Sequence, residues 1–254
     1  MNQKPKISII IPTYNEEINI EHTLLAIKRQ KCSIPYEIIV VDGQSSDNTV
    51  SIAEKFAKVY NSPEKGKSAQ LNYVVPKSSG ELLIFLDADT LINEYFIQKV
   101  YNIFEKHKNL FACSARVKYY DGKAIKFKLG SQIFTITNYF FLNINMHIWY
   151  FFKTLLGYPE LIGCNIIVRR DIFFKIGGFK KLPQGLIGID KVFSDSLIYL
   201  TRKMKRGKIK TLNFTSVLTS GRFLNTRRSL GRITQYHTKK EVFYNLAKDI
   251  NWKE

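Results

Sequence analysis

The feature that most constrains the fold is an apolar run, Leu82 to Leu86, that ends directly before two aspartates, Asp87 and Asp89. A short run of this kind is typical of a strand buried on both faces in an α/β sheet. Ligands of such sheets bind just beyond the carboxyl ends of the strands. Two carboxylates at that edge suit Mg²⁺ or Mn²⁺, and the ion can in turn hold a phosphate. An Asp-x-Asp pair also occurs in turns and at helix N-caps, so the surrounding sequence has to decide.

The preceding residues predict alternating strands and helices. Strands are expected at residues 6–11 and 37–41, and each is followed by a polar cluster. We expect Asn15 to cap a helix over residues 18–27, and a second helix over residues 50–57. Strands and helices that alternate in this way, with polar residues after each strand, form nucleotide-binding half-sheets. Because the sequence has no phosphate-binding glycine loop, a bound diphosphate has to be held by a metal ion and by lysines.

A series of short motifs follows along the chain: Ile9–Glu17, Val40–Thr49, Lys65–Asn72, Leu86–Asp89, Gly163–Asn165, Arg169–Asp171 and Gly177–Phe179. Each motif is weak alone, but their order and spacing are specific together. Together they resemble the inverting family-2 glycosyltransferases with the GT-A fold, and the resemblance covers most of the chain, from residue 6 to residue 230. It implies an α/β fold of the nucleotide-diphospho-sugar transferase type, with a mixed, mainly parallel, Rossmann-like sheet flanked by helices.

The resemblance implies a role for each site residue. The nucleoside of a nucleotide-sugar would lie against Pro12, Tyr14, Glu16 and Asp42. The donor phosphates would face Lys67, with Lys65 and Asn72 near it. The ribose and the metal ion would be held at Asp87, Ala88 and Asp89, with Asp89 and Asp87 as metal ligands. The acceptor or phosphate side would include Gly163, Asn165 and Arg222.

One position departs from the family pattern. Many members carry two consecutive aspartates after the second strand, whereas here Asp42 is followed by Gly43. Uridine, guanosine and thymidine diphospho-sugars therefore all stay compatible with the sequence.

An inverting transfer needs a carboxylate that accepts the proton of the attacking hydroxyl. In the resembled family this residue is an Asp of a Glu-Asp type motif at a helix start, a little over ten residues before a Gly. Asp195, upstream of Gly207, matches that position, and Asp190 is the second candidate. The usual Glu is replaced by Ser194. Asp195 can also serve as the N-cap of the helix, which does not exclude a role as the base.

Length and composition fit one large α/β domain. With 254 residues, the chain is long enough for one such core and short for two full domains. We expect a single GT-A domain over residues 1–232, with a donor half (1–90) and an acceptor half (91–232), then a helical tail over 233–254. The three cysteines show neither disulfide nor zinc spacing, which favours buried thiols in a reducing cytosol. We expect no secretory signal, because the first predicted strand begins at residue 6.

The chain is strongly basic, with 39 Lys and Arg against 21 Asp and Glu and a net charge of +18. Residues 199–254 alone contain 14 Lys and Arg against 3 Asp and Glu. Such a surface can attract anionic lipid, a phosphorylated substrate or nucleic acid, or it can simply be solvated. We expect no nucleic-acid partner, because the sequence has no aromatic-interleaved single-strand platform and no groove-reading helix motif.

Residues 133–156 hold 16 apolar residues and one charge, Lys153. The length approaches a membrane span. Polar residues interrupt the segment all around a helical wheel, however, and residues 142–148 alternate apolar and polar as a strand does. Three interpretations stay open: a buried or acceptor-covering element, partial insertion at a membrane interface, and a span, which the polar residues make costly. The aromatic run Trp149 to Phe152 suits an interfacial belt or a core.

Together these features predict a metal-dependent inverting glycosyltransferase that moves a sugar from a UDP-, GDP- or dTDP-sugar to a hydroxyl. The expected acceptor is a lipid-linked or cell-envelope saccharide, and the expected location is cytoplasmic, peripheral at the inner face of the membrane in contact with anionic lipid. A first alternative is a polyprenyl-phosphate sugar synthase similar to dolichol-phosphate mannose synthase, whose ionised acceptor needs no base. Other classes are a non-catalytic nucleotide-sugar-binding protein and a nucleotidyltransferase. Asp195 and the lack of a glycine-rich loop argue against both.

Overall fold

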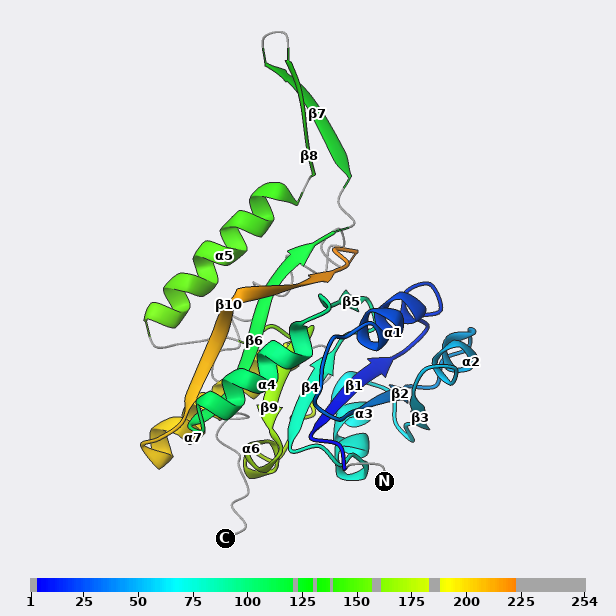
Figure 1. Cartoon of the computed structure of the whole chain (residues 1–254), viewed down its shortest axis with the longest axis vertical. Helices are drawn as coiled ribbons and strands as arrows, with labels where there is room; N and C mark the ends of the chain where they lie inside the picture. The colour runs from blue at the N-terminus through cyan, green and yellow to red at the C-terminus, as the bar shows by residue number, and fades with distance from the viewer. Residues whose placement is uncertain are drawn as a thin grey trace.

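The computed structural model describes residues 4–120, 123–129, 132–137, 139–156, 161–182 and 188–222. Within these ranges a mixed eight-stranded sheet forms the centre of the molecule (Figure 1). Its strands, in spatial order, are β3 (Lys58–Asn61), β2 (Tyr36–Asp42), β1 (Ile7–Thr13), β4 (Leu82–Leu86), β9 (Asn165–Arg169), β6 (Leu110–Tyr119), β10 (Lys208–Thr219) and β5 (Thr90–Leu91). Strand β9 runs antiparallel to β4 and β6, and β5 runs antiparallel to β10. The remaining pairs are parallel, so the predicted mixed, mainly parallel sheet is confirmed.

Helices cover both faces of this sheet, and the strands alternate their side chains between them. In β4, Ile84 faces one core while Phe85 faces the other. The first core is closed by α1 (Ile20–Lys28), α4 (Phe96–Lys106) and Ala53 at the end of α2 (Thr49–Ala53). The second is closed by α3 (Lys67–Val74) with the 3₁₀ turn Val75–Lys77, α6 (Arg170–Lys175) and α7 (Ile189–Met204). All five residues of β4 are buried, as the apolar run predicts.

Several predicted boundaries are wrong. Helix α1 begins at Ile20, so Asn15 is not its N-cap and Ile18 stays outside the helix, 80% exposed. Asn15 has a positive φ, and its side-chain oxygen instead accepts a hydrogen bond from the Ser46 backbone N–H at 2.8 Å. Helix α2 ends at Ala53, short of residue 57. Two further elements were not predicted as such: the edge strand β3, and helix α3 in the polar stretch 65–72.

Residues 133–156 divide between two elements. The first part belongs to an antiparallel hairpin of β7 (Ala124–Leu129) and β8 (Gln132–Thr137), which projects beyond the main sheet in Figure 1. The second part is helix α5 (Phe140–Leu155), so the strand-like alternation at 142–148 is misleading. In the parts of the chain that the structure describes, no helix is both long and apolar enough to cross a membrane.

Cys113 is buried, and Cys32 and Cys164 are partly buried; all three are free thiols, which agrees with the absence of disulfide spacing. The predicted C-terminal tail, 233–254, lies outside the described residues.

We predict that Ile84→Ala destabilises the fold by ~2–5 kcal/mol, because it leaves a cavity beneath a strand covered on both faces. The same substitution at Ile18 should change stability by less than ~0.5 kcal/mol, since that side chain is exposed. Urea denaturation of both variants checks the pair. Equal losses would contradict the boundary of α1 described above.

Candidate active site

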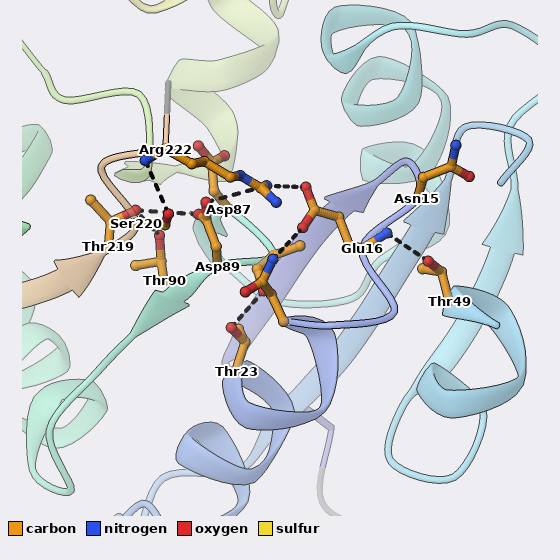
Figure 2. Close-up of polar contacts among 12 residues, drawn as sticks. Asn15, Glu16, Thr23, Thr49, Asp87, Asp89, Thr90, Thr219, Ser220 and Arg222 are labelled. Atoms are coloured by element: carbon orange, nitrogen blue, oxygen red, sulfur yellow. Dashed lines mark hydrogen bonds and ion pairs between the residues drawn. The ribbon is translucent and has the colours of Figure 1, made fainter. Parts of the chain in front are cut away.

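The two aspartates lie in a tight turn at the carboxyl end of β4. The Thr90 backbone N–H donates to the Asp87 carbonyl at 3.0 Å, and the Asp87 N–H donates to the Cys164 carbonyl at 3.1 Å. The Thr23 hydroxyl of α1 donates to the carbonyl of Ala88 at 2.7 Å (Figure 2). Asp87 keeps about a third of its side chain exposed, whereas that of Asp89 is only 6% exposed. The turn is therefore held from both sides, with one carboxylate open and the other buried.

The buried carboxylate is paired with an arginine from the end of β10. The Arg222 guanidinium contacts Glu16 of the first loop and lies 3.3 Å from Asp89, so it bridges the two acids (Figure 2). The Thr219 hydroxyl donates to the other oxygen of Asp89 at 3.2 Å. Burial, together with the charge of Asp87, raises the pKa of Asp89 to about 6, although Arg222 pulls it down. Arg222 therefore stabilises the ionised form of this buried carboxylate.

The open carboxylate has its own cation. Lys67, the first residue of α3, forms an ion pair with Asp87 and donates to the Gly163 carbonyl at 3.0 Å. Burial alone would lower the pKa of Lys67, but the charge of Asp87, its hydrogen bond with Lys67 and the charge of Asp190 together outweigh it, and the net shift is upward. Lys67 is therefore held as a cation at the end of β4, and its predicted contact with the donor phosphates stays a prediction.

The loops after β1 and β2 form one hydrogen-bonded edge. Asp42 is buried and accepts hydrogen bonds from the Thr13 hydroxyl at 3.0 Å and from the Ser45 backbone N–H at 2.8 Å. The Glu16 N–H donates to the Thr49 hydroxyl at 2.7 Å (Figure 2). Pro12 is buried within β1. Tyr14 is half exposed, with the Lys65 ammonium 5.0 Å from the centre of its ring. An aromatic face and a cation thus lie at the open rim of this edge.

The structure explains the departure at Gly43. The amide of Gln70, on α3, is buried and donates to the carbonyls of Thr13 at 2.7 Å and Val41 at 2.9 Å. A Cβ at Gly43 would lie 2.9 Å from that amide nitrogen and 3.2 Å from the Thr13 carbonyl oxygen. Glycine therefore makes room for a side chain that ties β1 to β2. Gln70 lies inside the motif Lys65–Asn72, but no role was predicted for it.

Two predicted site residues have structural partners instead. The Asn72 amide donates to the Phe179 carbonyl at 2.7 Å and accepts from the Phe179 N–H at 2.9 Å, which anchors the Gly177–Phe179 turn. Asn165 is fully buried in β9, and its amide bonds to both backbone groups of Ala115 in β6. Both amides thus bond to backbone groups in this structure, and their predicted contacts with a donor phosphate or an acceptor stay predictions. Gly163 stays at the site through its carbonyl, which accepts from Lys67.

The two base candidates lie on the same helix in different surroundings. Helix α7 begins at Ile189, so Asp195 is not its N-cap, and its carboxylate forms an ion pair with Lys191 one turn earlier. Asp190, in the first turn, lies against Gly163: a Cβ there would be 3.0 Å from its Oδ2. The charge of Asp190 also contributes to the raised pKa of Lys67. The contacts therefore place Asp190 beside the Lys67–Asp87 pair.

Comparison with known proteins identifies the family. The family model described as "Glycosyl transferase family 2" matches residues 8–177. A probable glycosyltransferase of Bacillus subtilis, YdaM, is 30% identical over 190 residues, which is 70% of this chain and 44% of that protein. The chain spans less than half the length of the curated relatives that it matches.

Solved structures agree on the fold. The mannosyltransferase PcManGT of Pyrobaculum calidifontis, in complex with GDP-Man and Mn²⁺, matches 94% of this chain and 64% of its own with a TM-score of 0.66 at 20% identity. Residues 1–349 of Staphylococcus aureus TarS, in complex with UDP-GlcNAc, match 85% of this chain and 58% of their own with a TM-score of 0.60 at 22% identity. Because the family model matches residues 8–177, the chain belongs to glycosyl transferase family 2, and the structural matches show that it has the GT-A fold.

Proposed function

We propose that the protein is a metal-dependent inverting glycosyltransferase that moves one sugar from a nucleotide-sugar to a hydroxyl of a lipid-linked or cell-envelope saccharide. The observation that carries the proposal is the set of opposite charges at the end of β4. Two acids, Asp87 and Asp89, meet two cations, Lys67 and Arg222, at the edge where α/β sheets bind ligands. This combination suits a diphosphate with a divalent cation better than a neutral ligand.

The donor would lie along the edge formed by the first two loops. Tyr14 and Lys65 at the rim suit a nucleobase and a phosphate, respectively. The carboxylate of Asp42 and the backbone N–H of Glu16 form hydrogen bonds in these loops. Both residues would contact the nucleoside while these bonds keep the loops in place. The two structurally similar proteins bind UDP-GlcNAc and GDP-Man, which supports a nucleotide-sugar donor here without selecting its base.

The residues at the site fit a divalent cation of the kind that substrate phosphates help to hold. Among the described residues, no group of three or more His, Cys, Asp or Glu could bind a metal ion unaided. Two carboxylates at one strand end are nevertheless what Mg²⁺ or Mn²⁺ needs when phosphates complete its oxygen ligands. Asp89 and Asp87 would hold the ion. When bound, it would stabilise the negative charge of the leaving diphosphate.

The chain's own residues would carry the remaining steps. The acceptor oxygen attacks the anomeric carbon from the face opposite the diphosphate, and the bond from that carbon to the phosphate oxygen breaks with its electron pair. Lys67 and Arg222 would stabilise the charge that develops on the nucleoside diphosphate. A carboxylate of α7 would accept the acceptor's proton. The contacts with Gly163 favour Asp190 for this role, and the motif match favours Asp195.

The first alternative keeps the donor site and changes the acceptor. If the acceptor is a polyprenyl phosphate, its oxygen is already ionised and no base is needed. The net charge of +18 would assist either a phosphorylated or a membrane-held acceptor. TarS of S. aureus is a poly(ribitol-phosphate) β-N-acetylglucosaminyltransferase, and its name supports an envelope polymer as the acceptor here.

We predict that Asp89→Ala lowers the transfer rate at least ~10²-fold. The substitution removes a metal ligand, and the metal ion would stabilise the negative charge of the leaving diphosphate by several kcal/mol. Mn²⁺ binding, followed by electron paramagnetic resonance in the presence of the nucleoside diphosphate, should weaken in parallel. Asp171→Ala, a matched loss of an exposed aspartate on α6, should change neither quantity. Full turnover of Asp89→Ala in EDTA would rule out metal dependence.

We predict opposite effects of Arg222→Met on two ligands. Without nucleotide, Mn²⁺ should bind about tenfold more tightly, because a positive charge 3.3 Å from Asp89 is gone. The nucleoside diphosphate should bind at least ~5-fold more weakly, because a phosphate loses a cationic partner. Calorimetry measures both affinities, with Arg29→Met, an exposed arginine at the end of α1, as the control. A parallel loss of both affinities would indicate that Arg222 serves only to hold the fold.

We predict that Asp190→Asn lowers transfer by ~10²–10⁴-fold, the usual contribution of a positioned base, while the donor still binds. Asp195→Asn should have a smaller effect, because its carboxylate is engaged with Lys191. Rates with a hydroxyl acceptor and calorimetry with the nucleotide-sugar distinguish the two losses. A loss confined to Asp195→Asn would contradict the assignment from contacts, and near-normal transfer by both variants would favour a phosphate acceptor.

A further inference from the structure

Helix α5 presents an apolar face to solvent. At about 100° per residue, five exposed apolar positions of the helix fall within an arc of about 80°, and the exposed residues Phe152 and Asn145 lie beside that arc. The five side chains are between 42% and 70% exposed; they are Phe140, Ile144, Ile148, Phe151 and Leu155. We call this set the α5 face. A contiguous row of large, exposed apolar side chains on one helix is typical of an interaction surface.

The start of the helix is held against the sheet by two contacts. Asn143 accepts a hydrogen bond from the Tyr119 backbone N–H at 3.0 Å, at the end of β6. Tyr139, just before the helix, is buried against the Tyr119 ring, with 5.6 Å between ring centres. Figure 1 shows α5 lying beside β10 and β6 with its outer side uncovered by the other labelled elements.

The charges around the α5 face suit an anionic surface. Residues 122–159, which include the β7–β8 hairpin and α5, contain four lysines and no acidic residue. Lys123, directly before β7, and Lys126, within β7, are exposed. Helices that lie in the plane of a membrane interface typically combine an apolar face with neighbouring lysines. A second copy of the chain fits less well, because each copy carries a net charge of +18.

We infer that α5 and the β7–β8 hairpin dock the protein on an anionic lipid leaflet, with the α5 face between the lipid head groups and the lysines on the lipid phosphates. The inference deepens the proposed function, on which it rests for the nature of the acceptor. The Tyr139 hydroxyl donates to the carbonyl of Gly221 at 3.0 Å, and the next residue is Arg222 of the donor site. The docked helix therefore brings the lipid surface next to the site, where a lipid-linked acceptor has to arrive.

Flotation of the full chain with lipid vesicles tests this surface without any donor or acceptor. Wild-type protein should float with phosphatidylcholine vesicles that contain phosphatidylglycerol, should not float with phosphatidylcholine alone, and should release as salt is raised. Phe151→Glu should weaken partitioning about tenfold or more. The substitution removes an aromatic side chain that would insert between the lipid head groups, and it adds a negative charge that the anionic lipids repel. Phe174→Glu is the matched control: this phenylalanine is 49% exposed on α6, far from α5 in Figure 1, and its variant should float like wild type.

The outcomes separate the alternatives. Leu155→Glu serves as a second variant at the end of the helix, and circular dichroism checks that all variants keep the wild-type fold. No flotation of wild type at low salt, or equal flotation of Phe151→Glu and Phe174→Glu, would overturn the inference. A dimer in sedimentation that Phe151→Glu dissociates would assign the α5 face to a second copy instead. Because no sugar is transferred in the assay, its failure would leave the proposed glycosyltransferase activity untouched.

Discussion

The placement of two carboxylates at the end of a fully buried strand is the constraint on which the site depends. An ionised carboxylate as covered as Asp89 is unfavourable unless a cation accompanies it, and the cation has to come from elsewhere in the chain. Arg222 arrives from the end of β10 and Lys67 from the start of α3. Each of the two aspartates therefore has a cationic partner before any ligand binds. A donor with its metal ion would exchange these internal partners for phosphates and a cation, so binding need not create a buried, uncompensated charge.

The surrounding loops are organised by hydrogen bonds that also restrict the site. The side chains of Asp42 and Thr49 hold the two loops after β1 and β2, and Gln70 ties the strands together in the space left by Gly43. Polar side chains that would otherwise approach a ligand are thus partly used to fix the edge of the sheet. The same holds for Asn72 and Asn165, whose amides bond to backbone groups of neighbouring segments. Rigid positioning of this kind favours a preorganised donor site.

Much of the donor half was predictable, because its signals are local. The apolar run of β4, its burial on both faces and the two aspartates after it follow from consecutive residues, and so does the position of Lys67 in its motif. Helix boundaries were less predictable. At Asn15 the side chain bonds to the second loop rather than to its own helix, and α1 begins five residues later. A residue's preference for an N-cap cannot reveal a competing partner 31 positions away in the sequence.

By itself, the sequence determined the class of fold, the strand that carries the acids, and the family to which the motifs belong. Hydrophobic periodicity and short motifs are properties of neighbouring residues, so they can be recognised in the sequence alone. Only the tertiary structure decided which cation meets which acid and that Asp190 lies beside Gly163 while Asp195 pairs with Lys191. It also decided that the apolar residues of α5 face outward. These relations depend on how β10, α3, α7 and α5 pack against the sheet, and packing joins residues whose separation along the chain carries no signal of their contact.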